Sequence, residues 1–153
     1  MLAGLVIRNF HPGDEREIFP IHKENEDFFE DFSFSEEFIA ELSQRDDFKF
    51  FVAEFSGNVA GFIGALFQTA AGRAEIGPIA VKKDFQHMEI GRKLLEQMLG
   101  FLIREGIRRT TIRVKEKNTE AVNFFKKSGF SQEGHFRDYT KNHEDVVQMV
   151  KFL

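Results

Sequence analysis

The segment that most constrains the fold joins an apolar strand to a long amphipathic helix through one short polar turn. Ile79-Ala80-Val81 ends a run of strand-forming residues, and Gly91 opens a segment in which apolar residues recur at helical spacing as far as Arg104. Gly106 follows as a helix terminator. A strand that passes directly into such a helix is typical of α/β domains, so we expect a sheet covered by helices.

The same two signals, short β-rich runs and segments with helical spacing, divide the rest of the chain into elements. Asp14, Ser35 and Asn118 are expected to cap helices, and Ser56-Gly57-Asn58 predicts a hairpin turn. The predicted order is β α α β β β α β α β β, within a single domain over residues 1–153. Strands are expected over residues 5–10, 50–55, 59–67, 73–81, 110–115, 130–136 and 146–152, and helices over 14–23, from 35 through 42, over 91–104 and over 118–127.

Composition excludes several kinds of site. The 153 residues contain no cysteine, which rules out disulfides, zinc–thiolate sites and a cysteine nucleophile. The five histidines show no metal-ligand spacing, so no metal site is expected. No signal peptide and no apolar run of transmembrane length is found, which predicts a cytoplasmic protein without a membrane partner.

The charges are distributed unevenly along the chain. Residues 1–76 carry 6 lysines and arginines against 15 acidic residues, whereas residues 77–153 carry 15 against 10. An anionic partner at the second half and a cationic partner at the first would explain this asymmetry, and two differently charged solvated surfaces would explain it equally well. A pI of about 5.8 without a long basic stripe argues against a nucleic-acid partner.

The turn before the long helix has the chemistry of a phosphate site. A helix N-terminus leaves backbone N–H groups unpaired and carries partial positive charge. Gly91 would let a phosphate approach the backbone closely, and Arg92 and Lys93 add positive charge in the first turn. Any strand–turn–helix needs a join of this kind, so the purely structural interpretation stays open on these residues alone.

Two motifs resemble those of the GNAT superfamily of N-acetyltransferases. The stretch Gln86-His87-Met88-Glu89-Ile90-Gly91 is similar to the Gln/Arg-x-x-Gly-x-Gly/Ala signature that binds acetyl-CoA, and it follows a strand that ends in an Ala-Val pair. Downstream, Asn118-x-x-Ala121-x-x-Phe124-Phe125-x-Lys127-x-Gly129-Phe130 resembles the family's Asn-x-x-Ala-x-x-Phe-Tyr-x-Lys-x-Gly-Phe. The motifs occur in the family's order, and the order of elements matches over nearly the whole chain.

The resemblance implies a fold and a co-substrate site. The fold would be a GNAT fold, with a mixed, mostly antiparallel central sheet of six to seven strands, about four flanking helices and a splay between the fourth and fifth strands. Acetyl-CoA would lie in this splay, with its pantetheine arm along the backbone of residues 79–81 and its pyrophosphate on the N–H groups of residues 87–92. The residues implied in co-substrate binding are Ile79, Ala80, Val81, Gln86, His87, Met88, Glu89, Ile90, Gly91, Arg92, Asn118 and Phe125.

The acceptor amine needs a base, because an alkyl ammonium with a pKa of roughly 10 is protonated at neutral pH and cannot attack a thioester. Glu75 lies four residues before Ile79 on the same strand and resembles the glutamate base of the histone-acetylating branch of the family. Strand alternation would equally allow Glu75 to be an ordinary solvent-facing residue. Tyr139, the single tyrosine, is the second candidate, for holding the acceptor or for a displaced acid role.

Three positions depart from the family pattern. Glu89 replaces a glycine beside the expected pyrophosphate, Phe125 replaces the tyrosine that protonates the departing thiolate, and Arg113 stands where one subgroup carries an acid. Two alternatives to an enzyme therefore stay open. One is a catalytically silent acyl-CoA-binding domain, and the other is an interaction module whose hairpin around His143 and final strand would pair subunits in a homodimer.

The acceptor itself is expected to be a small-molecule or peptide amine. Seven acidic residues without an intervening basic residue follow the first predicted helix, in the region that walls the acceptor pocket in the family. An acidic wall interleaved with phenylalanines would suit a cationic amine, a polyamine or a peptide N-terminus, whereas a solvated charge run is the simpler interpretation. These residues are Glu24, Glu26, Asp27, Glu30, Asp31, Glu36 and Glu37.

Overall fold

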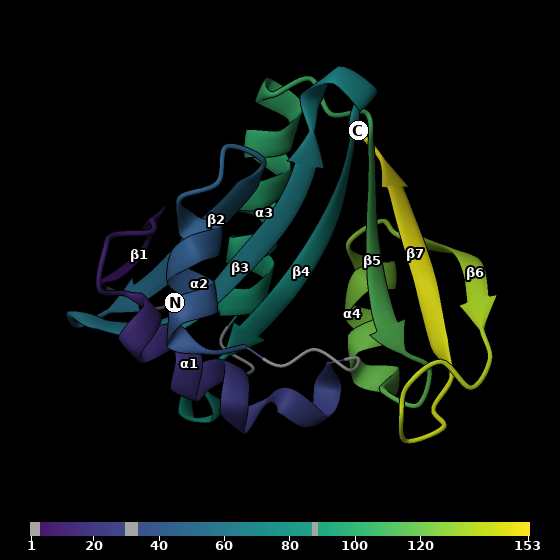
Figure 1. Cartoon of the computed structure of the whole chain (residues 1–153), viewed down its shortest axis with the longest axis horizontal. Helices are drawn as coiled ribbons and strands as arrows, with labels where there is room; N and C mark the ends of the chain where they lie inside the picture. Colours follow the sequence, from purple (N-terminus) through teal and green to yellow (C-terminus); the bar gives the residue numbers. More distant parts are fainter. Residues whose placement is uncertain (1–3, 30–33, 87–88) are drawn as a thin grey trace.

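The computed structural model describes residues 4–29, 34–86 and 89–153, and it contains a seven-stranded mixed sheet within these ranges (Figure 1). The strand order is β1-β2-β3-β4-β5-β7-β6, and β4–β5 is the one parallel pair among the described strands. The strands are β1 (Leu5–Asn9), β2 (Phe48–Phe55), β3 (Asn58–Gln68), β4 (Arg73–Val81), β5 (Arg109–Lys115), β6 (Ser131–Phe136) and β7 (Val146–Phe152). The seven strands predicted from the sequence are confirmed, with ends that differ by at most two residues.

The predicted helices are also found, and two of the three predicted caps are made. Ser35 accepts a hydrogen bond from the Phe38 N–H, and Asn118 accepts one from the Ala121 N–H, as N-cap residues do. The helices are α1 (Glu15–Glu24), α2 (Glu36–Ser43), α3 (Ile90–Arg104) and α4 (Thr119–Lys127), with 3-10 turns η1 (Glu26–Phe28), η2 (Thr69–Ala71) and η3 (Lys83–Phe85).

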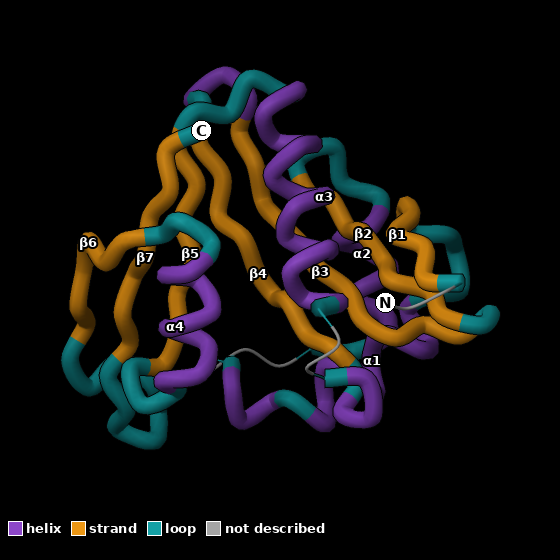
Figure 2. The backbone as a smooth tube through the Cα atoms, turned by 180° about the vertical axis from the view of Figure 1, so that it is seen from behind, coloured by secondary structure: helices purple, strands orange, loops and turns teal. Residues whose placement is uncertain are grey.

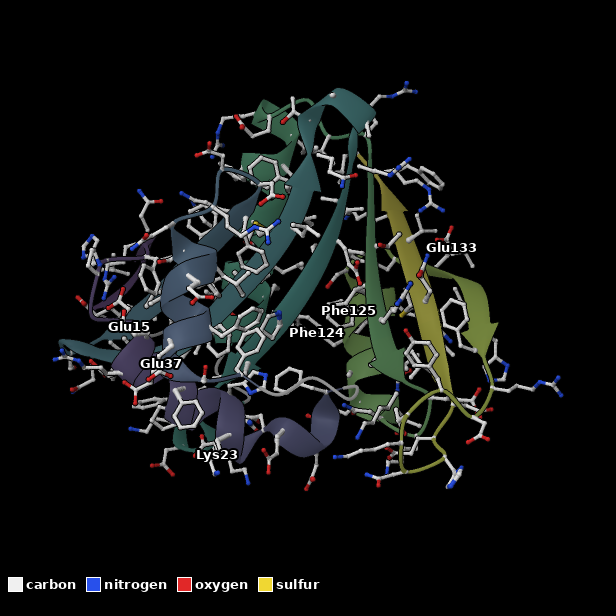
Figure 3. All side chains as sticks on the ribbon, in the orientation of Figure 1. Glu15, Lys23, Glu37, Phe124, Phe125 and Glu133 are labelled. Carbon is white, nitrogen blue, oxygen red and sulfur yellow. The ribbon has the colours of Figure 1, made fainter. Side chains whose placement is uncertain are left out.

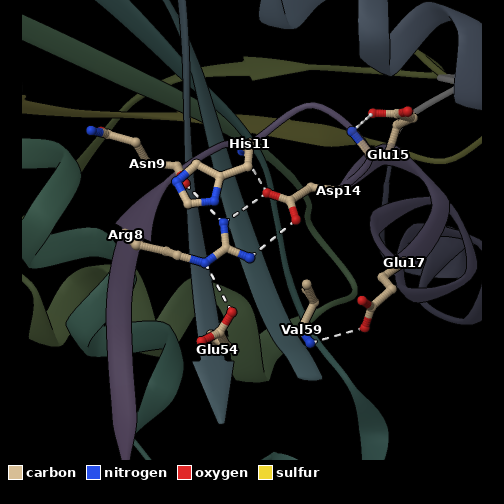
Figure 4. A network of polar contacts seen from close by, with 9 residues as sticks. Arg8, Asn9, His11, Asp14, Glu15, Glu17, Glu54 and Val59 are labelled. Atoms are coloured by element: carbon tan, nitrogen blue, oxygen red, sulfur yellow. Dashed lines mark hydrogen bonds and ion pairs between the residues drawn. The ribbon is translucent and has the colours of Figure 1, made fainter. Parts of the chain in front are cut away.

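The capping role predicted for Asp14 is wrong. Its carboxylate makes no cap hydrogen bond with α1 and instead forms a bidentate ion pair with Arg8 of β1, at 2.8 and 3.0 Å (Figure 4). Arg8 also donates to Glu54 of β2 at 3.1 Å. Because the guanidinium offers Asp14 two charge-assisted hydrogen bonds, it competes successfully with the backbone N–H groups of the helix. Asp14 therefore ties α1 to the edge of the sheet.

Helices cover both faces of the sheet. Helices α1 and α2 pack on one face, over a core that includes Ile18, Ile39 and Phe62. Helices α3 and α4 pack on the other face, over a larger core that includes Leu94, Met98 and Met149 (Figure 2). No helix in the described part of the chain is long and apolar enough to cross a membrane.

Strands β4 and β5 part in the middle of the sheet, as the resemblance implies. Their parallel register joins only residues 73–76 to residues 109–112. Beyond Ile76 and Ile112 the two strands diverge, and Figure 1 shows the gap that opens between them toward their carboxyl ends. The predicted splay between the fourth and fifth strands is confirmed.

A β-bulge interrupts β4 at the start of this gap. Ile63 of β3 pairs with Ile79 and Ala65 pairs with Ile76, so that Gly64 alone opposes the two residues Gly77 and Pro78. Gly77 has a φ of 151°, which glycine adopts without a steric penalty. The extra residue shifts the alternation of the strand: Ala74 and Ile76 face the α3 side before the bulge, and Ile79 and Val81 face it afterwards.

The final strand does not lie at an edge of the sheet. β7 pairs with β5 on one side and with β6 on the other, so its backbone has a neighbouring strand on both sides. The edges of the described sheet are β1 and β6. The sequence-based expectation that the last strand pairs subunits is therefore wrong, because a backbone paired on both sides has no free hydrogen-bonding edge.

Candidate active site

A cavity of about 690 Å³ lies where β4 and β5 part. Residues from α1, α2, β3, β4, β5, α4 and the turn before β7 line it, and we refer to it as the splay cavity. Among its lining residues are His22, Phe29, Phe34, Phe38, Arg45, Glu75, Gly77, Pro78, Ile79, Arg113, Asn118, Phe125 and Tyr139. The cavity therefore brings together residues that the sequence analysis assigned separately to the co-substrate and to the acceptor.

The end of β4 forms one wall of the splay cavity. Gly77, Pro78 and Ile79 line the cavity, and beyond Ile76 no described strand pairs with β4 on its β5 side. Ala80 is buried among the α1 and α2 residues, opposite Phe62. The Val81 carbonyl accepts hydrogen bonds from the side-chain amides of Asn25 and Gln86, so this part of the expected pantetheine contact is already taken up within the fold.

Gln86 holds the turn after β4. Its side-chain N–H donates at 3.1 Å both to the Val81 carbonyl and to the Asn25 side-chain carbonyl. The Glu24 carboxylate accepts a hydrogen bond from the Lys83 N–H at 2.8 Å and fixes the same turn to α1. The Gln86 side chain therefore positions the turn that is predicted to bind the pyrophosphate. His87 and Met88, predicted to follow it at the pyrophosphate, lie outside the described residues.

Helix α3 presents its N-terminus at this turn. Ile90, the first residue of the helix, is buried, and no side chain caps the helix at Glu89. Glu89 has a left-handed backbone, with a φ of 64°, and its exposed carboxylate pairs with Arg92 at 3.1 Å. Arg92 also contacts Glu96 at 2.6 Å, and these two carboxylates raise its pKa. The carboxylate of Glu89 is thus held by its neighbour on the helix surface.

Among the described residues, Gly91 has no packing partner that requires a glycine. A Cβ at this position would lie 3.7 Å from the Phe124 ring and 3.9 Å from the Val81 side chain, which are ordinary van der Waals distances. Gly91 also lies in the first turn of a helix, where glycine is less favourable than alanine by about 1 kcal/mol. Within the described part of the chain the fold offers no reason for this glycine, whereas the predicted close approach of a ligand to the backbone would explain it.

Helix α4 forms the opposite wall of the gap. Asn118 lines the cavity and caps the helix. Phe125, labelled in Figure 3, lines the cavity from within the core. Phe125 is 3% exposed, and its ring makes edge contacts with Phe124 and Phe130. Because a phenylalanine ring carries no hydroxyl, the described wall offers no proton donor at the position where the family pattern has tyrosine.

Glu75 lies at the mouth of the splay cavity. Its neighbours Ala74 and Ile76 face the α3 core, so Glu75 faces the opposite side of the sheet, where the cavity opens. Thr111 of β5 is its register partner. Glu75 is solvent-exposed and also a cavity-lining residue, so the two interpretations left open by the sequence are compatible.

Tyr139 lines the same mouth from the turn before β7. Its ring is 42% exposed and lies 5.5 Å from the ring of Phe136. Its hydroxyl accepts a hydrogen bond from Arg113 Nη1 at 2.9 Å. The structure therefore brings Glu75 and Tyr139, the two predicted catalytic residues, to one cavity, and it adds Arg113 between them.

Sequence reasoning missed His22 as a residue of the site. It is 3% exposed, its ring stacks between Phe29 and Phe34 at 4.3 and 4.4 Å, and it lines the cavity. Its Nε2 is buried, with no hydrogen-bond partner in the described part of the chain. Burial lowers the pKa of this histidine to about 4, so the imidazole is neutral at pH 7. The one feature of the sequence that could have identified His22 as a residue of the site was its position at the end of α1, among phenylalanines.

The described members of the acidic run do not provide the wall expected from the sequence. None of its members in the described ranges lines the cavity. The Glu24 carboxylate accepts a hydrogen bond from the turn after β4 instead. Glu36 and Glu37 lie in the first turn of α2, where carboxylates favour the helix N-terminus. Glu30 and Asp31 lie outside the described residues.

A second cluster lies on the surface, outside the splay cavity. Glu116, His135 and Asp145 come together from three separate segments, with His135 Nε2 at 2.9 Å from Glu116 and 3.0 Å from Asp145. The sequence could not predict this group, because its members are not close in sequence. The three side chains contact one another, and we assign no ligand to the cluster.

These features define a class of α/β protein in which two central parallel strands part beside a helix N-terminus that no described side chain caps. The profile of the acetyltransferase (GNAT) family matches residues 15–130. The chain therefore belongs to the GNAT acetyltransferase family, as its motifs suggested.

Individual relatives differ in the acceptor that their names give. The chain is 30% identical over 98 residues to the ribosomal protein bS18-alanine N-acetyltransferase of Escherichia coli K12, a match that covers 62% of this chain and 65% of that protein. It thus spans slightly less than two thirds of this curated relative. It is 27% identical over 130 residues to the 5-NmdU N-acetyltransferase of Pseudomonas phage PaMx11, covering 85% and 89% of the two chains.

Solved structures share the fold over nearly the whole chain. Ard1 from Thermoplasma volcanium superposes with a TM-score of 0.87 at 23% identity and covers 99% of both chains. The spermidine N-acetyltransferase of Vibrio cholerae, solved with CoA and spermine, gives a TM-score of 0.84 at 21% identity, covering 98% of this chain and 96% of that one. At these identities the likeness establishes the fold.

Acetyl-CoA, the co-substrate of this family, fits the residues present. The backbone of β4 beyond the bulge lacks a neighbouring strand among the described residues on the side of the gap. The glycine at the start of α3 leaves space that a Cβ would fill, and the Glu89 carboxylate is paired with Arg92. These observations match a ligand with amides along an extended arm and phosphates at one end.

Proposed function

We propose that this protein is an acetyl-CoA-dependent N-acetyltransferase that moves an acetyl group to a primary amine by direct attack. The observation that carries the proposal is the splay cavity, because it joins the open backbone of β4 to the carboxylate of Glu75 in one space. The residues proposed to bind acetyl-CoA and the candidate base Glu75 could therefore contact acetyl-CoA and the acceptor amine in the same cavity. Acetyl-CoA supplies the acetyl group as a thioester.

Glu75 is proposed to take the proton from the acceptor. Its carboxylate lies at the mouth of the cavity, where an ammonium group would enter from solvent. After the proton has moved to Glu75, directly or through a water molecule, the nitrogen lone pair can form the new N–C bond as the C–S bond breaks. The nitrogen then releases its second proton, which converts the departing thiolate into the free CoA thiol. The backbone N–H groups of β4 beyond the bulge are the proposed donors to the carbonyl oxygen.

The departing thiolate receives no proton from Phe125. A thiol with a pKa of roughly 8.5 is a tolerable leaving group as its anion, so turnover does not require a donor at that position. Two uncharged polar side chains also line the cavity, the amide of Asn118 and the hydroxyl of Tyr139. We propose that they orient the reactants.

The test combines binding and turnover. We expect calorimetry to show that acetyl-CoA binds more tightly than adenine nucleotide alone, with desulfo-CoA as a second comparison. Glu75→Gln should keep this affinity and lose turnover by a factor of about 10² or more, as removal of a general base does. Glu41→Gln, an exposed change on α2 outside the cavity, is the matched control and should keep both.

The absence of a hydroxyl on Phe125 also favours a second candidate, a catalytically silent acyl-CoA-binding domain. That candidate predicts acetyl-CoA binding without turnover of any amine, in the wild type as in Glu75→Gln. An interaction module that has lost the co-substrate predicts no acetyl-CoA binding. The cytoplasmic location and a homodimer stay predictions, to be checked by cell fractionation and by light scattering.

A further inference from the structure

The splay cavity contains an arginine that the proposed mechanism does not use. Arg113 lies on β5, one residue past the last β4–β5 pair, and it is half-buried at the mouth of the cavity. Ile112 and Val114 are buried on the α3 side, so Arg113 faces the cavity side of the sheet together with Thr111.

Only neutral groups hold the guanidinium of Arg113 in place within the described structure. Nη1 donates to the Tyr139 hydroxyl at 2.9 Å, and Nε donates to the Gln148 side-chain carbonyl at 3.1 Å. The guanidinium also lies 5.2 Å from the centre of the Phe136 ring and 5.8 Å from that of Tyr139. These contacts orient the cation but do not neutralise it.

Two other charged groups, one near Arg113 and one in the cavity wall, form ion pairs with other residues. Glu133, which accepts the Gln148 amide N–H at 2.7 Å, forms its ion pair with Arg109. Arg45, the other arginine that lines the cavity, forms a bidentate pair with Asp47 at 2.7 and 2.8 Å. Arg113 is thus a positioned, half-buried cation at the cavity mouth whose described partners carry no charge.

Glu75 and Arg113 lie on one face of adjacent strands, at a short separation. Glu75 is directly opposite Thr111 in the register, and Arg113 is two residues beyond Thr111. Paired strands lie about 4.8 Å apart and rise about 3.3 Å per residue, and β5 diverges from β4 after Ile112, so the two Cα atoms are at least about 8 Å apart. A molecule that offers an amine to Glu75 would therefore place groups a few bonds away beside Arg113.

We propose that the acceptor carries a carboxylate a few bonds from its reactive amine, and that Arg113 binds this carboxylate. The inference rests on the proposed function and names the substrate class of the same site. Of the acceptors expected from the acidic run (a cationic amine, a polyamine or a peptide N-terminus), it replaces the first two with a zwitterionic acceptor and keeps a peptide N-terminus only where a carboxylate lies nearby. Two sources share this chemistry: the α-carboxylate of a free amino acid, and an acidic side chain near the N-terminus of a peptide.

Turnover is measured with matched acceptors that differ only in the carboxylate. One arm compares L-leucine and L-phenylalanine with their amides, and the other compares peptides that begin Ala-Glu with peptides that begin Ala-Gln. An α-amine beside an amide is less basic than one beside a carboxylate, so an enzyme without anion recognition should prefer the amides. In one of the two comparisons we expect kcat/KM to be at least about tenfold higher for the acceptor with the carboxylate than for its amide counterpart. The amide counterpart lacks the charge-assisted hydrogen bond to Arg113.

The decisive variant is Arg113→Gln, with Arg113→Lys as the charge-retaining comparison. Arg113→Gln should abolish the preference through KM, and Arg113→Lys should restore part of it. Arg16→Gln removes a positive charge from an exposed position on α1, outside the cavity, and should leave the preference unchanged. If Arg113→Gln instead lowers kcat equally for every acceptor, the inference is wrong and Arg113 acts on the thioester or the thiolate.

A binding measurement separates this inference from the proposed function. The N-acetylated forms of the same amino acids and peptides are titrated calorimetrically into the protein with CoA present. Carboxylate-selective binding that Arg113→Gln weakens supports the anion site even if no amine is turned over. Binding that is equal for acids and amides, or no binding of either up to millimolar concentration, overturns the inference even if acetyl transfer is observed.

Discussion

Glu89 combines two properties that are unfavourable beside a phosphate site. Its backbone is left-handed, a conformation that costs a residue with a Cβ about 1 kcal/mol, and its side chain is negatively charged. The family pattern has glycine here, and the φ of 64° gives the physical reason. The pairing with Arg92 offsets the charge, but together with Glu96 it also engages a cation that lies near the predicted pyrophosphate site.

We predict that replacing Glu89 separates these two effects. Glu89→Gly and Glu89→Ala both remove the carboxylate and release Arg92 from one of its two partners, so both should bind acetyl-CoA more tightly than the wild type. Glu89→Gly should be more stable than Glu89→Ala by about 1 kcal/mol, since only alanine keeps the Cβ. Urea unfolding and calorimetric titration measure both quantities. Equal stability of the two variants would contradict the strain assigned to this position.

His22 makes the folded state sensitive to acid. The buried imidazole has a pKa of about 4, against 6.5 for a free histidine, so the unfolded chain binds a proton that the folded chain does not bind. The free energy of unfolding should therefore fall as the pH drops below about 6.5 and level off below about 4. The total loss implied by the two pKa values is about 3 kcal/mol.

The matching prediction is that His22→Leu flattens the pH dependence of stability. Between pH 7 and 5, above the range in which most carboxylates titrate, the wild type should lose up to about 1.4 kcal/mol per pH unit. The variant, although less stable at pH 7 because it loses the stacking on Phe29 and Phe34, should lose less over the same range. Urea unfolding at several pH values gives both slopes, and parallel slopes would show that His22 is not the group responsible.

At the scale of the elements, local patterns predicted the secondary structure well because each signal acts within a few residues. Helical spacing placed α3 to within one residue at its start, and the side chains of Ser35 and Asn118 acted as caps because their bonds are local. Asp14 failed for the opposite reason. Its partner Arg8 comes from another element, and the cap prediction considered only the residues that follow.

The site was predictable only where a motif or a strand end defined it. Glu75 and Tyr139 were named from the sequence and do line one cavity, because the strand order brings β4 next to β5 and the turn before β7. The bulge at Gly77-Pro78, the stacked His22 and the neutral partners of Arg113 depend on register and on packing between distant segments. A proline within a strand was the one local signal of the bulge.

Helix α3 offers a matched pair of glycines that tests its role in binding. Gly91→Ala should raise the free energy of unfolding by about 0.5–1 kcal/mol, because the Cβ meets only ordinary contacts and helix propensity improves. Gly100→Ala, in the same helix, places a Cβ 3.4 Å from the flexible tip of Arg104 and should stabilise similarly. Only Gly91→Ala should weaken acetyl-CoA binding in calorimetry, and an unchanged affinity would place the phosphates elsewhere.

At the scale of the whole molecule, the sheet has two halves joined by a short seam. Four residue pairs connect β4 to β5, and the strands then diverge. At the open end of the gap, Lys115 of β5 donates to the Asp27 carbonyl at 2.8 Å and links the two halves beneath the cavity. One core crosses the seam, because α3 residues such as Met98 and β7 residues such as Met149 belong to the same buried cluster.

This shared core predicts that the two halves unfold together, as one domain over residues 1–153. Calorimetric and van't Hoff enthalpies should agree for a single thermal transition, with an enthalpy on the order of 100 kcal/mol for a chain of this length. Acetyl-CoA at a hundred times its Kd should raise the free energy of unfolding by about 2.7 kcal/mol. Amide exchange should slow in β2–β4 and in β5–β7 alike, since a ligand in the splay cavity would contact both sides of the gap. Two transitions, or protection confined to one half, would show that the seam divides the protein into separately folding parts.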